Sequence, residues 1–265
     1  MNLPHLESSL NRLLTTVSRG TATILDRALS GQDLSVDEAT TLFEADGSDL
    51  LAMLAAADQL RAQTVGDVVS YVINRNINFT NVCVKQCGFC AFSRGHLAEE
   101  GYFLPIEEII RRATEARDLG ASEVCIQAGL APGMDGWHYV TLCRAVKEAL
   151  PELHIHGFSP EEVLYGSTLT GASIRDYLLA LKDAGVGSLP GTSAEIFVDA
   201  VRQRISPGRI SIDNWIEVIQ TAHEVGIPTT STIMYGHIET ARHRAIHLSV
   251  LRDVQKRTGG ITEFV

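Results

Sequence analysis

Strand-like and helical segments alternate through most of this chain, and no other feature constrains its fold as strongly. From Val68 onward, strands are expected near residues 77–82, 123–128, 153–158, 186–189, 228–234 and 261–265. Four joints repeat one pattern, in which a helix ends, glycine follows and a strand begins: Leu119-Gly120, Ala184-Gly185, Val225-Gly226 and Thr258-Gly259. Such alternation predicts an α/β fold with parallel strands. Because no GxGxxG motif follows the first strand, the pattern favours a TIM-type β/α barrel over a doubly wound sheet.

Capping signals mark several helix starts. Ser35-Val36-Asp37-Glu38 and Ser159-Pro160-Glu161-Glu162 both have the form of a capping box, and Ser173 and Ser211 each precede a helical stretch. Residues 1–68 contain only short helical segments without chemical motifs, so we expect an N-terminal helical cap there and the barrel over residues 69–265. The strand expected at 261–265 has nothing after it. Either the barrel is open after six strands or the chain lacks its C-terminal part. Because an open edge strand leaves backbone groups unpaired, we expect the second, a barrel truncated after about six strands.

Several of the expected strands alternate apolar and polar residues. His154 and His156 share one face of their strand, and Thr230 and Thr232 share one face of theirs. The interior of a sealed barrel favours branched apolar side chains. The polar faces therefore predict a lumen that holds a polar ligand.

Bulk composition excludes some classes of partner. The chain has 265 residues, of which 45% are hydrophobic and 20% charged, and its net charge of -10 argues against nucleic-acid binding. No apolar run approaches the roughly 20 residues that would cross a bilayer. The N-terminus lacks the pattern of a signal peptide, so a cytoplasmic protein is expected.

Three of the five cysteines lie within eight positions. Cys83, Cys87 and Cys90 have the spacing C-x3-C-x2-C, and Phe89 precedes the last of them. In a reducing cytosol this group indicates metal or redox chemistry rather than disulfides. Three thiolates can bind three irons of a 4Fe–4S cluster and leave the fourth iron open. S-adenosylmethionine (SAM) can chelate that iron, and reductive cleavage then yields a 5′-deoxyadenosyl radical.

Two other interpretations of the cysteine group stay open. A structural zinc site needs four ligands, and its fourth would lie far away in the sequence. A four-thiolate cluster would need Cys125 or Cys143. Cys143 lies on the apolar stripe of its helix and Cys125 lies in the middle of a strand, so both are predicted to be core residues.

The cysteine segment resembles that of the radical SAM superfamily. Within it, the chain is similar to a group that contains FO synthase and two radical enzymes of futalosine-dependent menaquinone biosynthesis. The segments that carry this resemblance are 78–83 and 89–94, and the FO synthase subunit 2 (CofH) type is favoured by 123–129, 154–162, 190–195 and 234–237. The resemblance covers residues 70–265, and such proteins normally continue well beyond this length to close an eight-stranded barrel.

The resemblance implies a transferase that forms a carbon–carbon bond. A 4-hydroxybenzyl group from L-tyrosine would join 5-amino-6-(D-ribitylamino)uracil, in the biosynthesis of FO, the deazaflavin core of coenzyme F-420. The implied cofactors are a 4Fe–4S cluster, held by the three cysteines, and SAM. The implied partners are an FO synthase subunit 1 (CofG) type enzyme, which cyclises the product, and a low-potential electron donor.

The same resemblance suggests SAM contacts at Phe89, Gln127, Gly129 and Glu195. Gln127-Ala128-Gly129 stands where the superfamily often has Gly-Gly-Glu, so the donor atoms differ from that pattern. Each position also has a purely structural interpretation. Phe89 could be a packing aromatic and Gly129 a turn residue. Glu195 is predicted to begin a helix, where a carboxylate is favoured in any case.

Candidates for catalysis or substrate contact are His156, Tyr235 and His237, which are expected near the ends of barrel strands. A hydrogen-bonded core histidine is the structural alternative. The arginines at 202, 204 and 209 could hold a carboxylate, although arginine usually lies on the surface.

Two rival functions remain at this point. Aminofutalosine synthase or dehypoxanthine futalosine cyclase would share the cysteine segment and the fold but take a chorismate-derived or nucleoside substrate. A non-catalytic Fe–S or zinc-binding module would share only the cysteines. Reductive cleavage of SAM would separate an enzyme from such a module.

Overall fold

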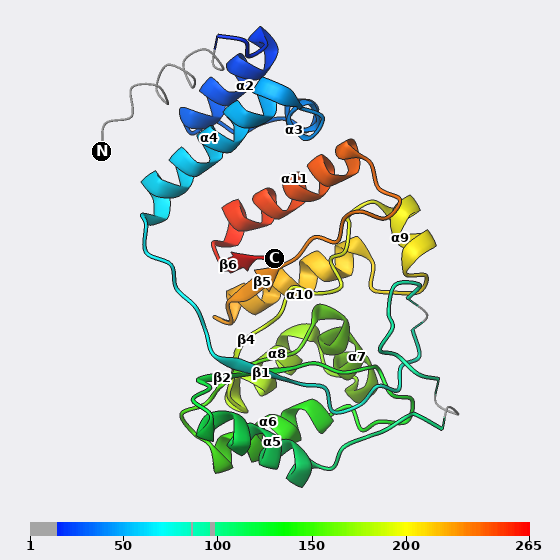
Figure 1. Ribbon diagram of the computed structural model, residues 1–265. Coiled ribbons are helices and arrows are strands. Elements are labelled where there is room, and N and C mark those ends of the chain that lie inside the picture. The colour runs from blue at the N-terminus through cyan, green and yellow to red at the C-terminus, as the bar shows by residue number, and fades with distance from the viewer. Residues whose placement is uncertain (1–14, 86, 96–98) are drawn as a thin grey trace. The chain divides into compact units, whose positions relative to one another are not determined.

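The structure is a computed structural model that describes residues 15–85, 87–95 and 99–265 (Figure 1). The chain divides into two compact units. The first consists of residues up to Ser70 together with Glu239–Ser249, and the second consists of Tyr71–Ile238 and Val250–Val265. Residues 1–14 of the expected helical cap, and Gln86 in the cysteine segment, lie outside the described residues.

Three helices form most of the first unit: α2 (Arg19–Leu29), α3 (Val36–Phe43) and α4 (Gly47–Val65). They pack around a small apolar core of Leu25, Ala52 and Ala56. The capping box predicted at Ser35 is confirmed, because the Ser35 side chain accepts from the Glu38 N–H and the Glu38 carboxylate accepts from the Ser35 N–H.

The strands of the second unit are parallel and lie side by side in sequence order. Strands β1 (Asn74–Ile77), β2 (Glu123–Ile126), β3 (His154–His156) and β4 (Val186–Ser188) make one sheet, and β5 (Thr229–Ser231) pairs with β6 (Ile261–Phe264). A parallel bridge between Leu189 and Thr229 links the two sheets. The strand order never reverses, as it would in a doubly wound sheet, so the β/α barrel arrangement is confirmed.

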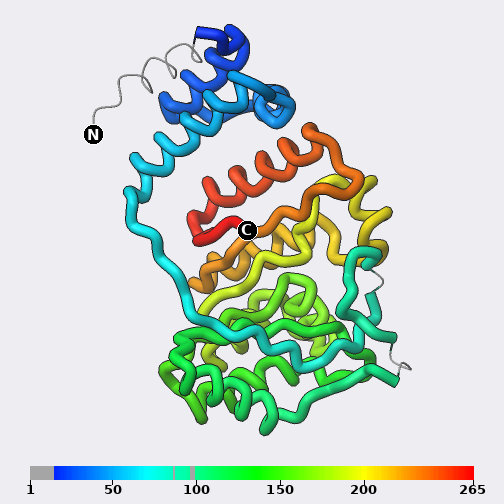
Figure 2. Tube along the Cα trace, in the orientation of Figure 1, coloured from blue at the N-terminus to red at the C-terminus, as the bar shows by residue number. Residues whose placement is uncertain are grey.

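Helices connect these strands, and the path can be followed in Figure 2. They are α5 (Ile106–Asp118), α6 (His138–Ala149), α7 (Pro160–Thr170), α8 (Ile174–Asp183), α9 (Asp199–Ile205), α10 (Ile212–Glu224) and α11 (Ala241–Thr258). The predicted serine caps are confirmed at Ser159, Ser173 and Ser211. The glycines expected after helices all have positive φ angles, which side chains rarely adopt: Gly120, Gly185, Gly226 and Gly259.

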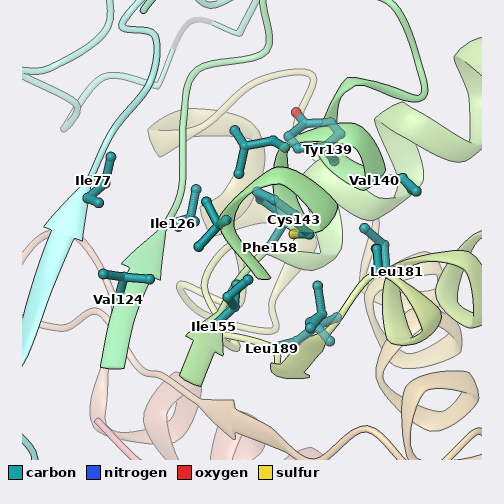
Figure 3. Packing of buried hydrophobic residues seen from close by; sticks show 14 of the residues in the cluster. Ile77, Val124, Ile126, Tyr139, Val140, Cys143, Ile155, Phe158, Leu181 and Leu189 are labelled. Carbon is teal, nitrogen blue, oxygen red and sulfur yellow. The ribbon is translucent and has the colours of Figure 1, made fainter. Parts of the chain in front are cut away.

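Apolar strand residues pack outward against the helices (Figure 3). Val124, Ile126 and Ile155 are fully buried and face a layer that includes Tyr139 of α6. Cys143 belongs to this core, as its sequence pattern predicts, and burial raises the pKa of its thiol well above the ordinary range. The intervening strand residues therefore point to the opposite face of the sheet, into the barrel.

The boundaries of the first strand were predicted wrongly. The expected strand at 77–82 is observed as Asn74–Ile77, and the chain then leaves the ladder. Polar side chains supplement the remaining backbone bonds there: the Asn78 amide donates to the Gln127 carbonyl at 2.8 Å, and the Thr80 hydroxyl donates to the Tyr102 carbonyl at 2.6 Å. The other strands are also shorter than expected, because the chain diverges into loops at their C-terminal ends.

Candidate functional site

The cysteine segment is a loop that follows β1. Two backbone bonds close its base, from the Cys83 N–H to the Arg94 carbonyl at 3.1 Å and from the Arg94 N–H to the Asn81 carbonyl at 2.8 Å. A third bond ties it to the C-terminal end of α9, from the Gly88 N–H to the Ile205 carbonyl at 2.8 Å. The three cysteines are thus held in a compact loop at the C-terminal end of a barrel strand, where barrel active sites lie.

Each of these three cysteines is partly exposed, and each of their sulfur atoms accepts a hydrogen bond. Cys83 accepts from the Lys85 N–H and Cys90 from the Ser93 N–H, both at 3.4 Å, and Cys87 accepts from Arg209 at 3.3 Å. Burial raises the pKa of Cys87 despite the arginine. For Cys90, burial is outweighed by hydrogen bonds to Ser93, so the pKa of its thiol is lowered.

The chemistry of these sulfurs suits a 4Fe–4S cluster, whose irons are usually bound by cysteine thiolates. Among the described residues, no group of three His, Cys, Asp or Glu side chains converges to hold one metal ion. In a 4Fe–4S cluster each thiolate binds its own iron, so the sulfurs surround a volume instead of meeting at one point. Hydrogen bonds to the sulfurs are also a usual feature of such sites.

Gly129 packs directly against the cysteine loop. A Cβ atom added there would lie 2.3 Å from the Val82 carbonyl oxygen and 3.1 Å from the Cβ of Cys83. The Gly129 N–H donates to the Thr80 carbonyl at 2.9 Å, and the Val84 N–H donates to the Leu130 carbonyl at 3.0 Å. Glycine is needed here because two backbone segments approach too closely for any side chain.

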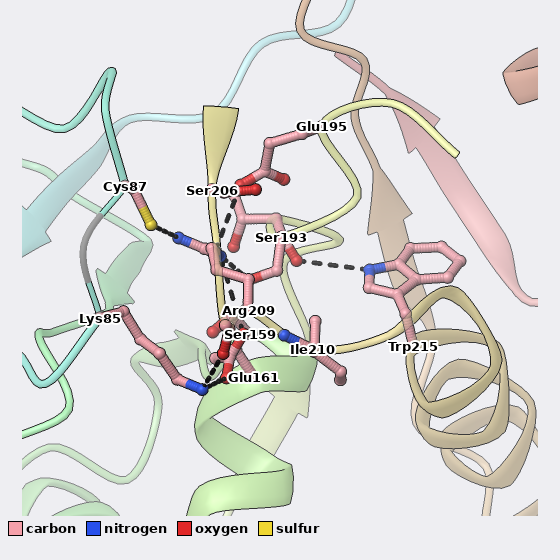
Figure 4. Close-up of polar contacts among 12 residues, drawn as sticks. Lys85, Cys87, Ser159, Glu161, Ser193, Glu195, Ser206, Arg209, Ile210 and Trp215 are labelled. Carbon is pink, nitrogen blue, oxygen red and sulfur yellow. Dashed lines mark hydrogen bonds and ion pairs between the residues drawn. The ribbon is translucent and has the colours of Figure 1, made fainter. Parts of the chain in front are cut away.

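Arg209 stands at the centre of a buried polar group beside Cys87 (Figure 4). Its guanidinium lies 3.3 Å from Glu195 Oε1 and 3.6 Å from Glu161 Oε2, and it also donates to the Ser193 hydroxyl. The pKa of Arg209 is raised, because these carboxylates and the Cys87 thiol outweigh the effect of burial. The expectation that this arginine lies on the surface is wrong, since its side chain is 18% exposed.

Arg202 is buried as well. It donates to the Ala194 and Ile210 carbonyls at 2.6 Å each, and so ties together the loops before and after α9. Phe197 packs on Trp215 with 4.8 Å between ring centroids, which anchors the same loop on α10. Arg204, in contrast, is exposed.

The expectation that Glu195 begins a helix is wrong. The helix begins at Asp199, and Glu195 lies in the preceding loop with a φ angle of 41°. Its carboxylate is buried and faces Arg209 instead of a helix terminus. Burial raises the pKa of Glu195 although Arg209 opposes the shift. The interpretation of this residue as a helix cap is therefore excluded.

A cavity of about 340 Å³ opens beside the cysteine loop, and we call it the cysteine-side cavity. Phe89, Gln127 and Glu195 line it, together with Ser193, Arg209 and Glu162. Its volume is within the range of small-molecule sites. Three of the four positions suggested as SAM contacts therefore face one space, and the fourth, Gly129, lies behind it against Cys83.

Glu162 is a site residue that sequence reasoning identified only as a helix cap. Its carboxylate accepts from the Ser159 N–H at 2.8 Å and from the Ala128 N–H at 2.9 Å, next to Gln127. Burial raises its pKa to about 7 although these hydrogen bonds oppose the shift. The capping box at the end of β3 was the only sequence signal for it.

A second cavity, of about 500 Å³, lies within the barrel, and we call it the lumen cavity. The polar strand faces predicted from the sequence line it, including His154, His156, Thr230 and Thr232. Gln127 and Thr192 line both cavities and are joined by a hydrogen bond of 3.1 Å. The two cavities are therefore neighbours along the barrel.

The remaining candidates are not brought together. Tyr235 and His237 lie beyond the end of β5, and neither lines the two cavities of the described structure. The Tyr235 side chain is largely exposed, and a ring nitrogen of His237 hydrogen-bonds the Met234 carbonyl at 2.9 Å. Cys125, predicted to be core, instead lines the lumen cavity, where burial raises its pKa to about 11.

Comparison with protein families gives a match over most of the second unit. The model of the radical SAM superfamily matches residues 77–251. Among curated relatives, the 5-amino-6-(D-ribitylamino)uracil–L-tyrosine 4-hydroxyphenyl transferase of Methanothermobacter thermautotrophicus is 48% identical over 92% of this chain. FO synthases of Streptomyces coelicolor and Mycobacterium leprae are 47% and 49% identical over 96% and 86% of the chain.

The chain spans only part of these relatives, namely 66% of the transferase and 29% and 26% of the two FO synthases. Solved structures share the fold at low identity. Methylornithine synthase is 20% identical with a TM-score of 0.67, covering 87% of this chain and 64% of that one. The hydrogenase maturase HydG of Carboxydothermus hydrogenoformans is 15% identical with a TM-score of 0.69, covering 98% and 59%. Within the described residues, no helix combines the length and apolarity that crossing a membrane requires.

Proposed function

The chain belongs to the radical SAM superfamily, and from this premise we propose that it is a transferase acting on L-tyrosine and 5-amino-6-(D-ribitylamino)uracil. It would join the 4-hydroxybenzyl group of tyrosine to the uracil, as a step toward FO and coenzyme F-420. The observation that carries the proposal is the 48% identity, over 92% of this chain, to a relative named for that transfer. Identities of 47% and 49% to FO synthases support the same pathway.

We assign the cofactors to the cysteine loop and its cavity. The superfamily implies a 4Fe–4S cluster and SAM, and the proposed cluster ligands are Cys83, Cys87 and Cys90. When bound, the cluster and SAM supply a radical that removes a hydrogen atom from the substrate. The partly exposed sulfurs and their hydrogen bonds support this assignment.

For SAM, the proposed contacts are Phe89, Gln127, Gly129 and Glu195. The Phe89 ring offers a flat apolar surface to an adenine, and the Glu195 carboxylate can accept from an ammonium group. Gly129 has no side chain and so lets the backbone next to Cys83 pack closely against it. Arg209 places a positive charge next to Cys87 and so offsets part of the effect of burial, which disfavours the thiolate form needed for iron binding.

The lumen cavity is the proposed site of the organic substrates. Its polar residues can hydrogen-bond hydroxyl, carbonyl and amino groups, which both proposed substrates carry. His156 is the one member of the proposed catalytic set that lines this cavity, so we retain it as a substrate contact. An enzyme of the FO synthase subunit 1 type would take the product, and a low-potential donor in the cytoplasm would supply electrons.

A product assay tests this proposal. Cluster-loaded protein, with SAM and reductant under anaerobic conditions, should form 5′-deoxyadenosine only when tyrosine is present. The coupled product should appear only when the ribityl-uracil is added. Phenylalanine should not replace tyrosine, because a site built for hydrogen bonds strongly rejects an analogue that lacks one. Turnover with an enolpyruvyl benzoate or a futalosine, and none with tyrosine, would instead assign the chain to menaquinone biosynthesis.

A further inference from the structure

Four polar side chains that line the lumen cavity lie next to one another in a continuous series, namely Glu123, His154, Ser188 and His156. Glu123 on β2 is the register partner of His154 on β3, and His156 is the register partner of Ser188 on β4. The Ser188 hydroxyl lies 2.8 Å from His154 Nε2 and 2.7 Å from His156 Nδ1. Glu123 Oε2 lies 3.8 Å from His154 Nε2.

The single proton of the Ser188 hydroxyl limits how this series can be arranged. The hydroxyl can donate to only one of the two imidazoles, so the other imidazole must donate to it. If His154 donates through Nε2, the hydroxyl donates to His156 Nδ1, and the proton of His156 is then on Nε2. If His156 donates through Nδ1 and the hydroxyl donates to His154 Nε2, both histidines carry the proton on Nδ1 instead. The hydroxyl oxygen could also accept from both rings, but the described residues then offer its own proton no other acceptor.

Glu123 selects the first arrangement. Asn74 donates to Glu123 Oε1 at 3.2 Å, which leaves Oε2 facing the His154 ring. A carboxylate is only an acceptor, so its presence near His154 Nε2 favours a proton on that nitrogen. Gly187 leaves room for the His154 ring, because a Cβ atom added at Gly187 would lie 2.3 Å from that ring.

His156 therefore presents an N–H group to the cavity. Burial lowers its pKa, although the nearby carboxylates of Glu123 and Glu263 oppose the shift, so the neutral form of the ring is favoured. Its Nδ1 atom is engaged by Ser188. Among the described residues, none hydrogen-bonds its Nε2 atom, which remains available to a ligand.

We propose that Glu123, His154 and Ser188 form a polar relay, in which Ser188 hydrogen-bonds both histidines and the Glu123 carboxylate acts on His154 from 3.8 Å, and that this relay fixes His156 as a donor, through Nε2, to a carbonyl oxygen of the ribityl-uracil. In this proposal, which rests on the proposed function, His156 contacts the substrate and the other three are positioning residues. The lumen cavity favours this substrate over tyrosine at that point. Its described lining has no lysine or arginine and includes two carboxylates, so it does not suit the carboxylate of an amino acid.

The first test reads the tautomers directly. Nuclear magnetic resonance of cluster-loaded protein with ¹⁵N-labelled histidine rings should show His154 and His156 protonated on Nε2, with each signal assigned by its loss in the corresponding His→Gln variant. The His156 Nε2–H signal should shift when 5-amino-6-(D-ribitylamino)uracil binds and should not shift with tyrosine. Protonation of both rings on Nδ1 would overturn the proposal.

The second test measures affinity for the ribityl-uracil by calorimetry. His156→Leu should weaken binding by about tenfold, the loss expected for one hydrogen bond. His156→Gln, which keeps an N–H donor, should recover most of the affinity, and Ser188→Ala should weaken binding by a few-fold. A matched control is Thr258→Val, which removes a 2.6 Å hydrogen bond to His223 outside both cavities and should leave affinity unchanged.

The possible outcomes distinguish a failure of the relay from a failure of the proposed function. If the wild-type protein binds the ribityl-uracil and His156→Leu, with unchanged thermal stability, binds it equally well, the relay is wrong and the proposed function stands. If the wild-type protein does not bind the ribityl-uracil, the proposed function and the substrate part of this proposal both fail. If Thr258→Val weakened affinity for the ribityl-uracil as much as Ser188→Ala does, the effect would be one of general destabilisation, and the relay would be overturned.

Discussion

Replacing Gly129 with alanine should damage the cysteine loop selectively. The added Cβ would lie 2.3 Å from the Val82 carbonyl oxygen, whereas ordinary van der Waals contact begins at 3.4 Å. The backbone next to Cys83 must therefore move by about 1 Å, and the Gly129 bond to Thr80 and the Val84 bond to Leu130 lie in the same strained region. Overpacking of this kind costs about 1–3 kcal/mol. At about 2–4 °C per kcal/mol for a unit of this size, the melting temperature should fall by about 2–12 °C.

Two measurements check this prediction. Iron and sulfide bound per chain after anaerobic reconstitution should fall clearly in Gly129→Ala, because the loop that carries Cys83 is displaced. The control is Gly88→Ala, in the same loop, whose Cβ would lie at an ordinary 3.5 Å from the Ile205 carbonyl. This control should keep its iron and its melting temperature. Equal iron content and stability in the two variants would refute the close-packing argument.

Three further changes have expected outcomes. Cys87→Ala should abolish the cluster, measured as bound iron, whereas Cys143→Ala should retain it because that thiol is buried in the core; retention in Cys87→Ala would contradict the assignment. Arg202→Met should lower thermal stability by about 2–5 kcal/mol, because two buried carbonyls lose their donors, while Arg204→Met on the same helix should have little effect. Because the folded pKa of Glu162 is raised to about 7 from an ordinary 4.5, its protonation stabilises the fold fully below pH 4.5, and this contribution is lost as the pH rises through 7. The melting temperature of the wild type relative to Glu162→Gln should therefore fall between pH 4.5 and 8, and a constant difference would exclude this linkage.

Local signals in the sequence predicted most of the architecture. The serine caps at Ser159, Ser173 and Ser211 and the positive-φ glycines are features of a few adjacent residues, so they can be identified without tertiary information. Alternation along strands likewise predicted that His156 and Thr230 line the lumen. The ends of the strands were less predictable, because the regular backbone ladder stops there and side chains such as Asn78 add bonds of their own.

The buried charges could not be predicted because their partners are distant in sequence. Arg209 pairs with Glu161 and Glu195 and bonds Cys87, which precedes it by 122 positions. On sequence alone an arginine after a short helix is most simply a surface residue. Cys125 was predicted to be a core residue because it stands between two apolar residues of its strand. It lies on the polar face of the sheet instead, as its register pairing with His156 shows.

The strand β2 connects the two cavities through its alternation. Successive residues on one face of a strand are about 7 Å apart, so Glu123, Cys125 and Gln127 mark three levels along the lumen. His156 is the register partner of Cys125, and therefore lies one level from Gln127, which lines both cavities. The pyrimidine ring of a substrate held by His156 is about as wide as the spacing between two of these levels. Its edge away from His156 would therefore lie close to the cysteine-side cavity. The substrate contact proposed at His156 is for this reason compatible with chemistry that starts on the cysteine side.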